Sequence, residues 1–562
     1  MNKIFYILAI IFFTFSASSA QQVKKVGFTL DSAKAFFEAS PNLNESAKEF
    51  KNKAISIYEN GDTESAAELL ADSKYFEILD KFGKKLSDEQ KAYFLANSDV
   101  LQEFITILSP LDNLEQSFSI LSDIWNIDSG ASFVKFSRLA LAIAIVFDSK
   151  PYLNWPHSQV NEEILPRALP NHVDAFNMWI EQRQKRRLIF PIERLSIEEL
   201  KYLVASLANN EDREWVQRSV PVSIGNVEKL YYSVPYATER ITAKAYNWTG
   251  TDYRLKTIRD TGGICTDQAY FTAEVAKCSG IPAFIFTGAG KDGFHAWAAY
   301  MVRPGVWNFD VGRYKESRFV TGRTVDPQTW NHATDHALES LREGFRRNVK
   351  YRSNQVHTMF AQIYFDDGNF DKAEAAARAA ISQDSRNIDS WKMLIAASEK
   401  LNKNEVQIRS LYDNAIKAFS KYPDVDAALR KILIKSYNES GKEEMAQKLT
   451  TSIIIKTKAS RPDIAMSFAR AELEFGIATN SAQRLYSSYK RLLSNFKKDG
   501  AMAVEGIFIP IEIQLLNVQK IDEGLEVLKI TRQVLKPEKN STIAANIDSI
   551  ENQLNAIKNA DD

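Results

Sequence analysis

The sequence predicts an α+β protein in which a small antiparallel sheet, with one helix packed on it, lies between two helical regions. Three observations lead to this fold class: helical periodicity from about Asn44 to Leu207, short strand-like runs from Val220 to Gly312, and renewed helical periodicity after Tyr351. With 562 residues, 45% of them hydrophobic, the chain is long enough for two to four domains. We divide it into a helical N-terminal region, a mixed domain and a helical array, at residues 21–219, 220–350 and 351–562.

Residues 1–20 have the pattern of a secretory signal peptide. Lys3 precedes an apolar run from Ile4 to Phe15, and the small residues Ser18-Ser19-Ala20 follow it. This run is too short for a stop-transfer helix, and no later run is long enough to cross a membrane. We therefore expect an exported protein, periplasmic or secreted, with no membrane span.

The charge balance argues against whole classes of partner. Lys plus Arg and Asp plus Glu both total 71, so there is no electrostatic footprint for nucleic acid or anionic lipid. The sequence also predicts no cofactor and no metal. His332 and His336 lie one helical turn apart, but Ala333 stands where zinc proteases have Glu, so we expect an exposed helix face there.

The N-terminal region contains two informative segments. The run from Phe133 to Phe147 has charges only near its start, which predicts a helix that becomes fully buried. The proline-bearing stretch from Pro151 to Pro170 predicts an ordered loop or linker. Within that stretch, His157 has no partner at a spacing that would indicate chemistry.

The mixed domain is expected to hold one helix and three strands. The helix covers residues 265–279, and the strands are expected at residues 283–287, 294–302 and 306–311. Cys265 and Cys278 are about 20 Å apart along that helix, whereas a disulfide requires Cα atoms about 4.4–6.8 Å apart. We therefore expect two free thiols, with Cys278 a small core residue.

Cys265, His295 and Asp310 supply a nucleophile, a base and an orienting carboxylate for thiol acyl transfer. Cys265 follows Gly262-Gly263 at a helix start, where the helix dipole and a nearby imidazolium would lower the pKa of the thiol. We expect its sulfur within about 4 Å of a His295 nitrogen, in a cleft open to solvent. The backbone N–H of Cys265 is the simplest oxyanion donor. Candidates for a second donor are Asn247, Trp248 and Tyr253.

His295 and Asp310 meet only if the hairpin between their strands has a suitable register. Direct opposition requires a wide connection, such as residues 300–305, or a bulge. A two-residue turn at Pro304-Gly305 would instead place Asp310 opposite Ala299, about 13 Å along the strand from His295. We expect the wider loop.

The C-terminal region resembles a tetratricopeptide repeat array. Small and aromatic residues occupy the spaced positions of one repeat, and Trp391 follows His357 by 34 residues to open the next. The positions concerned are His357, Phe360, Ala361, Tyr364, Gly368, Phe370, Ala373, Ala377 and Ala380. The region is long enough for about five or six such helix pairs, which commonly bind a protein partner.

Several spaced motifs of the mixed domain resemble the bacterial transglutaminase-like superfamily, whose core is papain-like. They are Gly263-Ile264-Cys265 with Ala269, Gly280-Ile281-Pro282-Ala283, His295-Ala296-Trp297 and Trp307-Asn308-Phe309-Asp310. The resemblance covers roughly residues 227–313. It implies Cys265 as nucleophile, His295 as general base and acid, and Asp310 as orienter of the imidazole. Ile264 stands where animal transglutaminases have Gln, which argues against crosslinking by analogy with them.

These patterns predict an exported thiol acyl-transfer enzyme, most simply a cysteine amidase or peptidase with a Cys265, His295 and Asp310 triad. Its substrate would be a peptide or protein amide, and hydrolysis is the first choice because water is the commoner acceptor in an exposed site. Two alternatives stay open. One is a protein-crosslinking transglutaminase, and the other is a non-catalytic exported scaffold that binds peptides.

Overall fold

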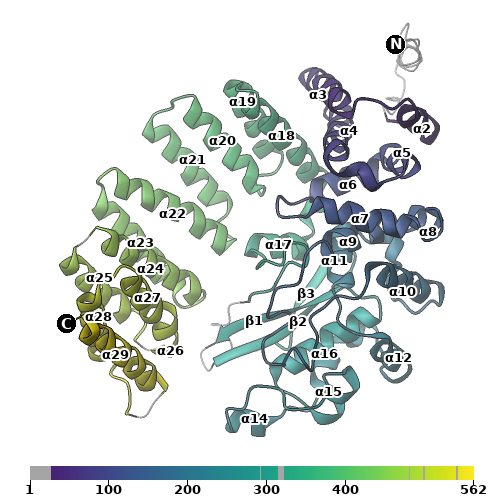
Figure 1. The fold of residues 1–562 in the computed structure, drawn as a ribbon. Helices are drawn as coiled ribbons and strands as arrows, with labels where there is room; N and C mark the ends of the chain where they lie inside the picture. Colours follow the sequence, from purple (N-terminus) through teal and green to yellow (C-terminus); the bar gives the residue numbers. More distant parts are fainter. Residues whose placement is uncertain are drawn as a thin grey trace.

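The computed structural model describes residues 27–561, apart from 291–292, 314–321, 480, 498–499 and 540–541. The expected signal peptide lies outside the described residues. The chain is mostly helical, with one small three-stranded antiparallel sheet (Figure 1). In the part of the chain that the structure describes, no helix is both long and apolar enough to cross a membrane.

The N-terminal region is a group of helices packed around α9 (Ser137–Val146). Residues Leu139 to Val146 of α9 are buried on every side, as the sequence predicts, but the run breaks at Phe136 into α8 and α9. The helices α6 (Ser98–Ile107), α7 (Leu114–Trp125) and α11 (Ile197–Val204) pack against α9. The others are α2 (Leu30–Glu38), α3 (Leu43–Glu59), α4 (Thr63–Phe82), α5 (Asp88–Ala96), α8 (Ala131–Lys135), α10 (His172–Gln184) and α12 (Asn210–Ser219).

The sheet has the order β1-β2-β3, and all of its strands are antiparallel. The strands are β1 (Ala283–Gly290), β2 (Gly293–Arg303) and β3 (Val306–Val311), and β1 pairs with β2 from Ala283 opposite Tyr300 to Gly290 opposite Gly293. Around the sheet lie α13 (Val227–Tyr232), α14 (Thr238–Thr242), α15 (Leu255–Thr261) and α16 (Cys265–Cys278). The predicted helix and three predicted strands correspond to α16, β1, β2 and β3.

The two faces of the sheet belong to different cores. Side chains alternate along a strand, so Ala296 and Ala298 of β2 point toward α16, whereas Trp297 and Met301 point toward the N-terminal helices. The core that contains Trp297 and Met301 joins the sheet to α9 and α11 in one continuous cluster. The expected boundary at residue 219 therefore divides a shared hydrophobic core.

The C-terminal helices form an arc that starts beside the N-terminal helices and curves away (Figure 1). Consecutive helices are joined by short turns and pack on their neighbours. They are α18 (Val349–Asp366), α19 (Phe370–Gln383), α20 (Ile388–Lys400), α21 (Glu405–Ala418), α22 (Pro423–Glu439), α23 (Glu443–Thr457), α24 (Pro462–Ala478), α25 (Ala482–Ser494), α26 (Gly500–Ala503), α27 (Ile509–Asn517), α28 (Ile521–Leu535) and α29 (Thr542–Asp561).

The start of this arc shares a core with helices that lie some 300 residues earlier. Ala54 and Leu70, from α3 and α4, belong to the same cluster as Phe360 and Trp391 of the array. The ring of Tyr58 stacks on Phe360, with ring centroids 3.9 Å apart. The start of the array therefore packs directly on the N-terminal helices α3 and α4.

Helix α17 (Asp335–Glu343) connects the sheet to the inside of the arc (Figure 1). It packs on β3 and on α22. His336 is buried against Phe345 and Tyr422, and its Nε2 donates to the Arg386 carbonyl at 2.5 Å. The expectation of an exposed helix face at His336 is wrong, because the array covers it.

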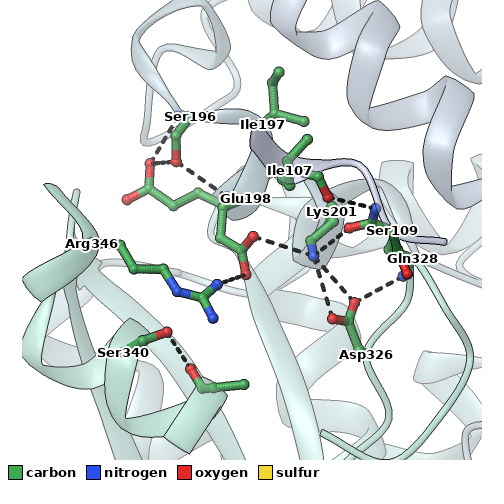
Figure 2. Close-up of polar contacts among 12 residues, drawn as sticks. Ile107, Ser109, Ser196, Ile197, Glu198, Lys201, Asp326, Gln328, Ser340 and Arg346 are labelled. Carbon is green, nitrogen blue, oxygen red and sulfur yellow. Dashed lines mark hydrogen bonds and ion pairs between the residues drawn. The ribbon is translucent and has the colours of Figure 1, made fainter. Parts of the chain in front are cut away.

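A buried polar network holds α11 against the segment that precedes α17 (Figure 2). The Lys201 ammonium lies 3.2 Å from Asp326 and 3.3 Å from Glu198, and it donates to Gln328 at 2.9 Å. Burial alone would lower the pKa of Lys201, but the carboxylates of Asp326 and Glu198 outweigh burial and raise it. Arg346, near the array, pairs with Glu198 at 3.7 Å.

The far end of the arc has its own core, with an unpaired carboxyl group inside it. Glu512 of α27 is 1% exposed, and neither of its carboxyl oxygens has a hydrogen-bond partner among the described residues. Gly524 of α28 leaves room for this carboxyl group, since a Cβ on Gly524 would lie 2.8 Å from Oε2 of Glu512. Burial raises the pKa of Glu512 to about 8.

Candidate active site

The approach to Cys265 is a tight elbow that only glycine fits. Gly262 has a φ of +84°, and a Cβ on it would lie 2.6 Å from the Pro235 carbonyl oxygen. A Cβ on Gly263 would overlap the side chain of Asp267. The Gly263 N–H donates to the Pro235 carbonyl at 2.8 Å, and the Ala237 N–H donates to the Gly263 carbonyl at 3.0 Å. The elbow delivers the chain directly into α16.

Cys265 is the first residue of α16, and its side chain lies against the middle strand. The Ala296 N–H of β2 and Thr266 both form hydrogen bonds with the thiol. Tyr231 donates from its hydroxyl to the Ala296 carbonyl at 2.8 Å and to the Cys265 carbonyl at 3.4 Å. These hydrogen bonds link the start of α16 to β2 at Ala296, the residue that follows His295 in the sequence.

Both thiols are free, as the sequence predicts, and both are buried. Cys265 is 8% exposed, and burial raises the pKa of its thiol; the charge of Asp267 raises it further, against the opposing effect of the Ala296 and Thr266 hydrogen bonds. The expectation of a lowered pKa is wrong, because burial outweighs the hydrogen bonds that lower it. Burial raises the pKa of Cys278, in the core below, to about 12.

His295 lies on β2 with its imidazole held by a backbone group. Nε2 donates to the Gly312 carbonyl at 2.8 Å, so Nε2 carries the hydrogen of the neutral ring. The ring stacks with Trp297, with centroids 6.0 Å apart. Burial lowers the pKa of His295, although the Gly312 carbonyl raises it in part. Among the described residues, no hydrogen bond joins the imidazole to Cys265.

Asp310 does not orient His295. Its side chain is 62% exposed, and its carboxylate accepts from Arg313 at 3.1 Å. No hydrogen bond connects it to His295 in the part of the chain that the structure describes. The orienting position on Nε2 is taken by the Gly312 carbonyl, two residues further along the chain.

The hairpin register explains this separation. Arg303 pairs with Val306, so the connection is the two-residue turn at Pro304-Gly305, and the expected wider loop is wrong. Gly305 has a φ of +79°, and its N–H donates to Glu199 of α11 at 2.7 Å, which anchors the tight turn. A bulge follows in β3 between the pairs of Asn308 and Val311, but it turns Asp310 to solvent instead of toward His295.

Known proteins give no independent guide to this site. No family model matches the chain, and no curated protein matches its sequence. The resemblance to transglutaminase-like proteins therefore depends on the sequence motifs around Cys265, His295 and Asp310 alone.

The backbone N–H of Cys265, the expected oxyanion donor, has no acceptor among the described residues. It lies at the N-terminus of α16. Two of the expected second donors are committed elsewhere: Trp248 donates to the Asp252 carbonyl at 2.9 Å, and Tyr253 donates to Asp267 at 2.6 Å. Asn247, which is exposed, is the remaining candidate of the three.

Sequence reasoning missed a buried chain of polar residues beside Cys265. It consists of His157, Tyr253 and Asp267, with Arg240 at its edge. An acidic residue at the third position of α16 is a recognisable helix-start signal. The links from Asp267 to Tyr253 and His157 span 14 and 110 positions and arise only from tertiary packing.

The described residues contain no cluster of three or more His, Cys, Asp or Glu that could hold a metal ion. A cavity of about 560 Å³ lies in the array between α19, α20 and α21. Its lining includes Trp391, Leu394 and Leu411, with Arg378 and Lys417 as cations. This cavity belongs to the array, whereas Cys265 is almost fully covered.

Proposed function

We propose that the protein is an exported thiol acyl-transfer enzyme, most simply a cysteine amidase or peptidase built on a papain-like core. One observation carries the proposal: Cys265 begins a helix that is docked, through the thiol itself, on the backbone next to His295. The unpaired Cys265 N–H adds the oxyanion donor that acyl transfer requires. The C-terminal helices would be a tetratricopeptide-like array.

The roles follow from the protonation states. Burial raises the pKa of Cys265 and lowers that of His295, so the resting pair at neutral pH is a thiol and a neutral imidazole. Nε2 of His295 donates to Gly312, which leaves Nδ1 as the nitrogen that can accept a proton. His295 would act as a general base during attack, and not as the partner of a preformed thiolate.

The proposed reaction then has two halves. Cys265 Sγ bonds to the amide carbonyl carbon as its proton moves to His295 Nδ1, and the C–N bond breaks as that proton passes to the leaving amine. Water, or a second amine in a crosslinking reaction, then attacks the thioester and releases Cys265. The scheme requires the thiol and the imidazole to come into contact when substrate binds. In the resting structure the His295 ring stacks on Trp297, whose side chain belongs to the core on the face of the sheet opposite α16, so the imidazole must turn toward Cys265. Asp310 has no part in this scheme.

The test is mass spectrometry of the intact protein after incubation with an activated acetyl ester. We expect one acetyl group on Cys265, absent from Cys265→Ala and retained in the matched variant Cys278→Ala. His295→Ala should slow the labelling by about a hundredfold or more, as expected for the loss of a general base. Labelling that ignores both Cys265 and His295 would end the proposal.

A non-catalytic, peptide-binding scaffold is the second candidate, and two observations favour it. Asp310 is paired with Arg313, and burial raises the pKa of the Cys265 thiol. The cavity of the array, with an apolar lining and the cations Arg378 and Lys417, suits an acidic peptide. A scaffold would bind such peptides without acylating Cys265, and Lys417→Glu would weaken binding.

A further inference from the structure

Asp267 ties the backbone just before Cys265 to a set of buried donors. Its carboxylate is 0% exposed and accepts from the Tyr253 hydroxyl at 2.6 Å, from Arg240 at 2.8 Å and from the Ile264 N–H at 2.8 Å. This N–H belongs to the peptide group between Gly263 and Ile264, one residue before Cys265. Asp267, at the third position of α16, therefore fixes the backbone at the residue before Cys265, as the acidic member of a capping box does.

The chain of hydrogen bonds continues to His157 with a defined direction. The Gln159 N–H donates to Nδ1 of His157 at 3.3 Å, so Nε2 carries the ring hydrogen and donates to the Tyr253 oxygen at 3.1 Å. The Tyr253 hydroxyl in turn donates to Asp267. Burial, with the charges of Arg167 and Arg240, lowers the pKa of His157 to about 3, so the ring stays neutral and the direction holds at ordinary pH.

The loop that carries His157 is itself fixed. Arg167 donates to the carbonyls of Leu153 at 2.7 Å, His157 at 3.2 Å and Val160 at 2.8 Å, which closes the loop on itself. The backbone N–H of Trp248 donates to the Gln159 carbonyl at 2.8 Å and joins this loop to the segment before α15. A part of the N-terminal region is thus built into the wall behind Cys265.

We propose that the buried relay His157, Tyr253 and Asp267 is the positioning device for Cys265, and that it sets both the place and the charge environment of the thiol. The inference rests on the proposed function only in taking Cys265 as the reacting group. Asp267 lies two residues after Cys265, and Arg240 balances its charge. None of the three relay residues touches the substrate in this scheme, so they are positioning residues.

The first experiment tests whether the negative charge of Asp267 affects the ionisation of the Cys265 thiol. Asp267→Asn keeps an acceptor oxygen for Ile264 or Tyr253 but removes the negative charge and leaves Arg240 unbalanced, and both changes favour the thiolate. In iodoacetamide alkylation of the full chain across pH, we expect Cys265 in this variant to react about threefold or more faster at pH 7, with a lower midpoint. Cys278, read by peptide mass spectrometry, is the internal control. An unchanged midpoint for Cys265, or an equal shift for Cys278, would overturn the proposal.

The second experiment tests whether the relay holds the backbone around Cys265 in place. Tyr253→Phe keeps the ring and breaks the relay, and we expect amide hydrogen exchange in residues 262–268 to rise about tenfold. Tyr270→Phe is the matched control, because its ring lies 4.9 Å from that of Tyr253 while its hydroxyl has no bond to a described residue. His157→Phe should have the effect of Tyr253→Phe, and the double variant should be no worse than either one. Additive effects, or equal exchange in the Tyr270→Phe variant, would contradict a relay.

These outcomes are distinct from a failure of the proposed function. If Cys265 never takes an acyl group but its alkylation and exchange respond as described, the relay stands and the enzyme proposal falls. If acylation occurs while Asp267→Asn and Tyr253→Phe change neither readout, the relay falls alone.

Discussion

The buried carboxyl of Glu512 makes the far end of the array weaken as pH rises, and Glu512→Gln should remove that weakness. Both oxygens lack a hydrogen-bond partner among the described residues, so burial keeps the carboxyl protonated, with a pKa of about 8 in place of 4.5. A raised folded-state pKa means that the folded chain holds a proton which the unfolded chain releases. The stability of this core is therefore full below about pH 4.5 and falls until pH passes about 8.

The size of the effect follows from the same values. In the unfolded chain, pH 7 lies about 2.5 units above the pKa of this carboxyl. Keeping it protonated in the folded core therefore lowers the free energy of unfolding by about 3 kcal/mol at this pH. At pH 5 the cost is below about 1 kcal/mol. A neutral Gln carries no such cost, so the variant should gain about 3 kcal/mol over the wild type at pH 7 and little at pH 5.

The assay must report on the C-terminal helices alone. All nine tryptophans precede residue 392, so fluorescence would follow other parts of the chain. Pulsed hydrogen exchange during a urea titration, read on peptides from residues 504–530, isolates this core. Glu505→Gln is the control, because Glu505 is exposed and lies one helix earlier. A Glu512→Gln midpoint that rises equally at pH 5 and pH 7, or in neither, would refute the reasoning.

Three further outcomes are expected. The alkylation rate of Cys265 should still be rising at pH 9, because burial holds the pKa of its thiol above its usual value, and a plateau near neutral pH would show a thiolate that the structure does not contain. Asp310→Asn should leave Cys265 acetylation within about twofold of wild type while His295→Ala slows it by about a hundredfold or more, and equal losses would restore Asp310 as the orienter. Lys201→Met should lower the stability of the chain by about 1–3 kcal/mol, since it leaves Asp326, whose side chain is 24% exposed, without its cation; an unchanged midpoint in urea unfolding would contradict this.

The elements of the fold were largely predictable because they depend on local patterns. The helix at Cys265 follows two glycines, and the three strands are short apolar runs between glycine and proline. Their bounds match closely. The packing between the three expected regions was not predictable, because sequence periodicity cannot show that one face of β2 and the ring of Tyr58 pack on distant helices.

The candidate site was predictable only in part. The sequence places Cys265 beside the strand of His295, and the structure agrees. The partner of His295 was missed because it depends on a turn: Gly305 accepts a left-handed conformation and is anchored by Glu199, which fixes the register and leaves Asp310 outside. The partners of Asp267 were missed because His157 comes from a segment with no local signal.

The contact between the first helices and the array has a consequence for how the chain is made. Tyr58 and Phe360 pack face to face, yet about 300 residues must be synthesised between them. Until α18 emerges, the apolar residues of α3 and α4 that pack on the array, such as Ala54 and Leu70, have no cover, and the long separation along the chain makes this contact slow to form. The N-terminal helices are thus completed only after α18 has been made, although they are synthesised first, and a nascent or truncated chain exposes an apolar surface that the complete protein buries.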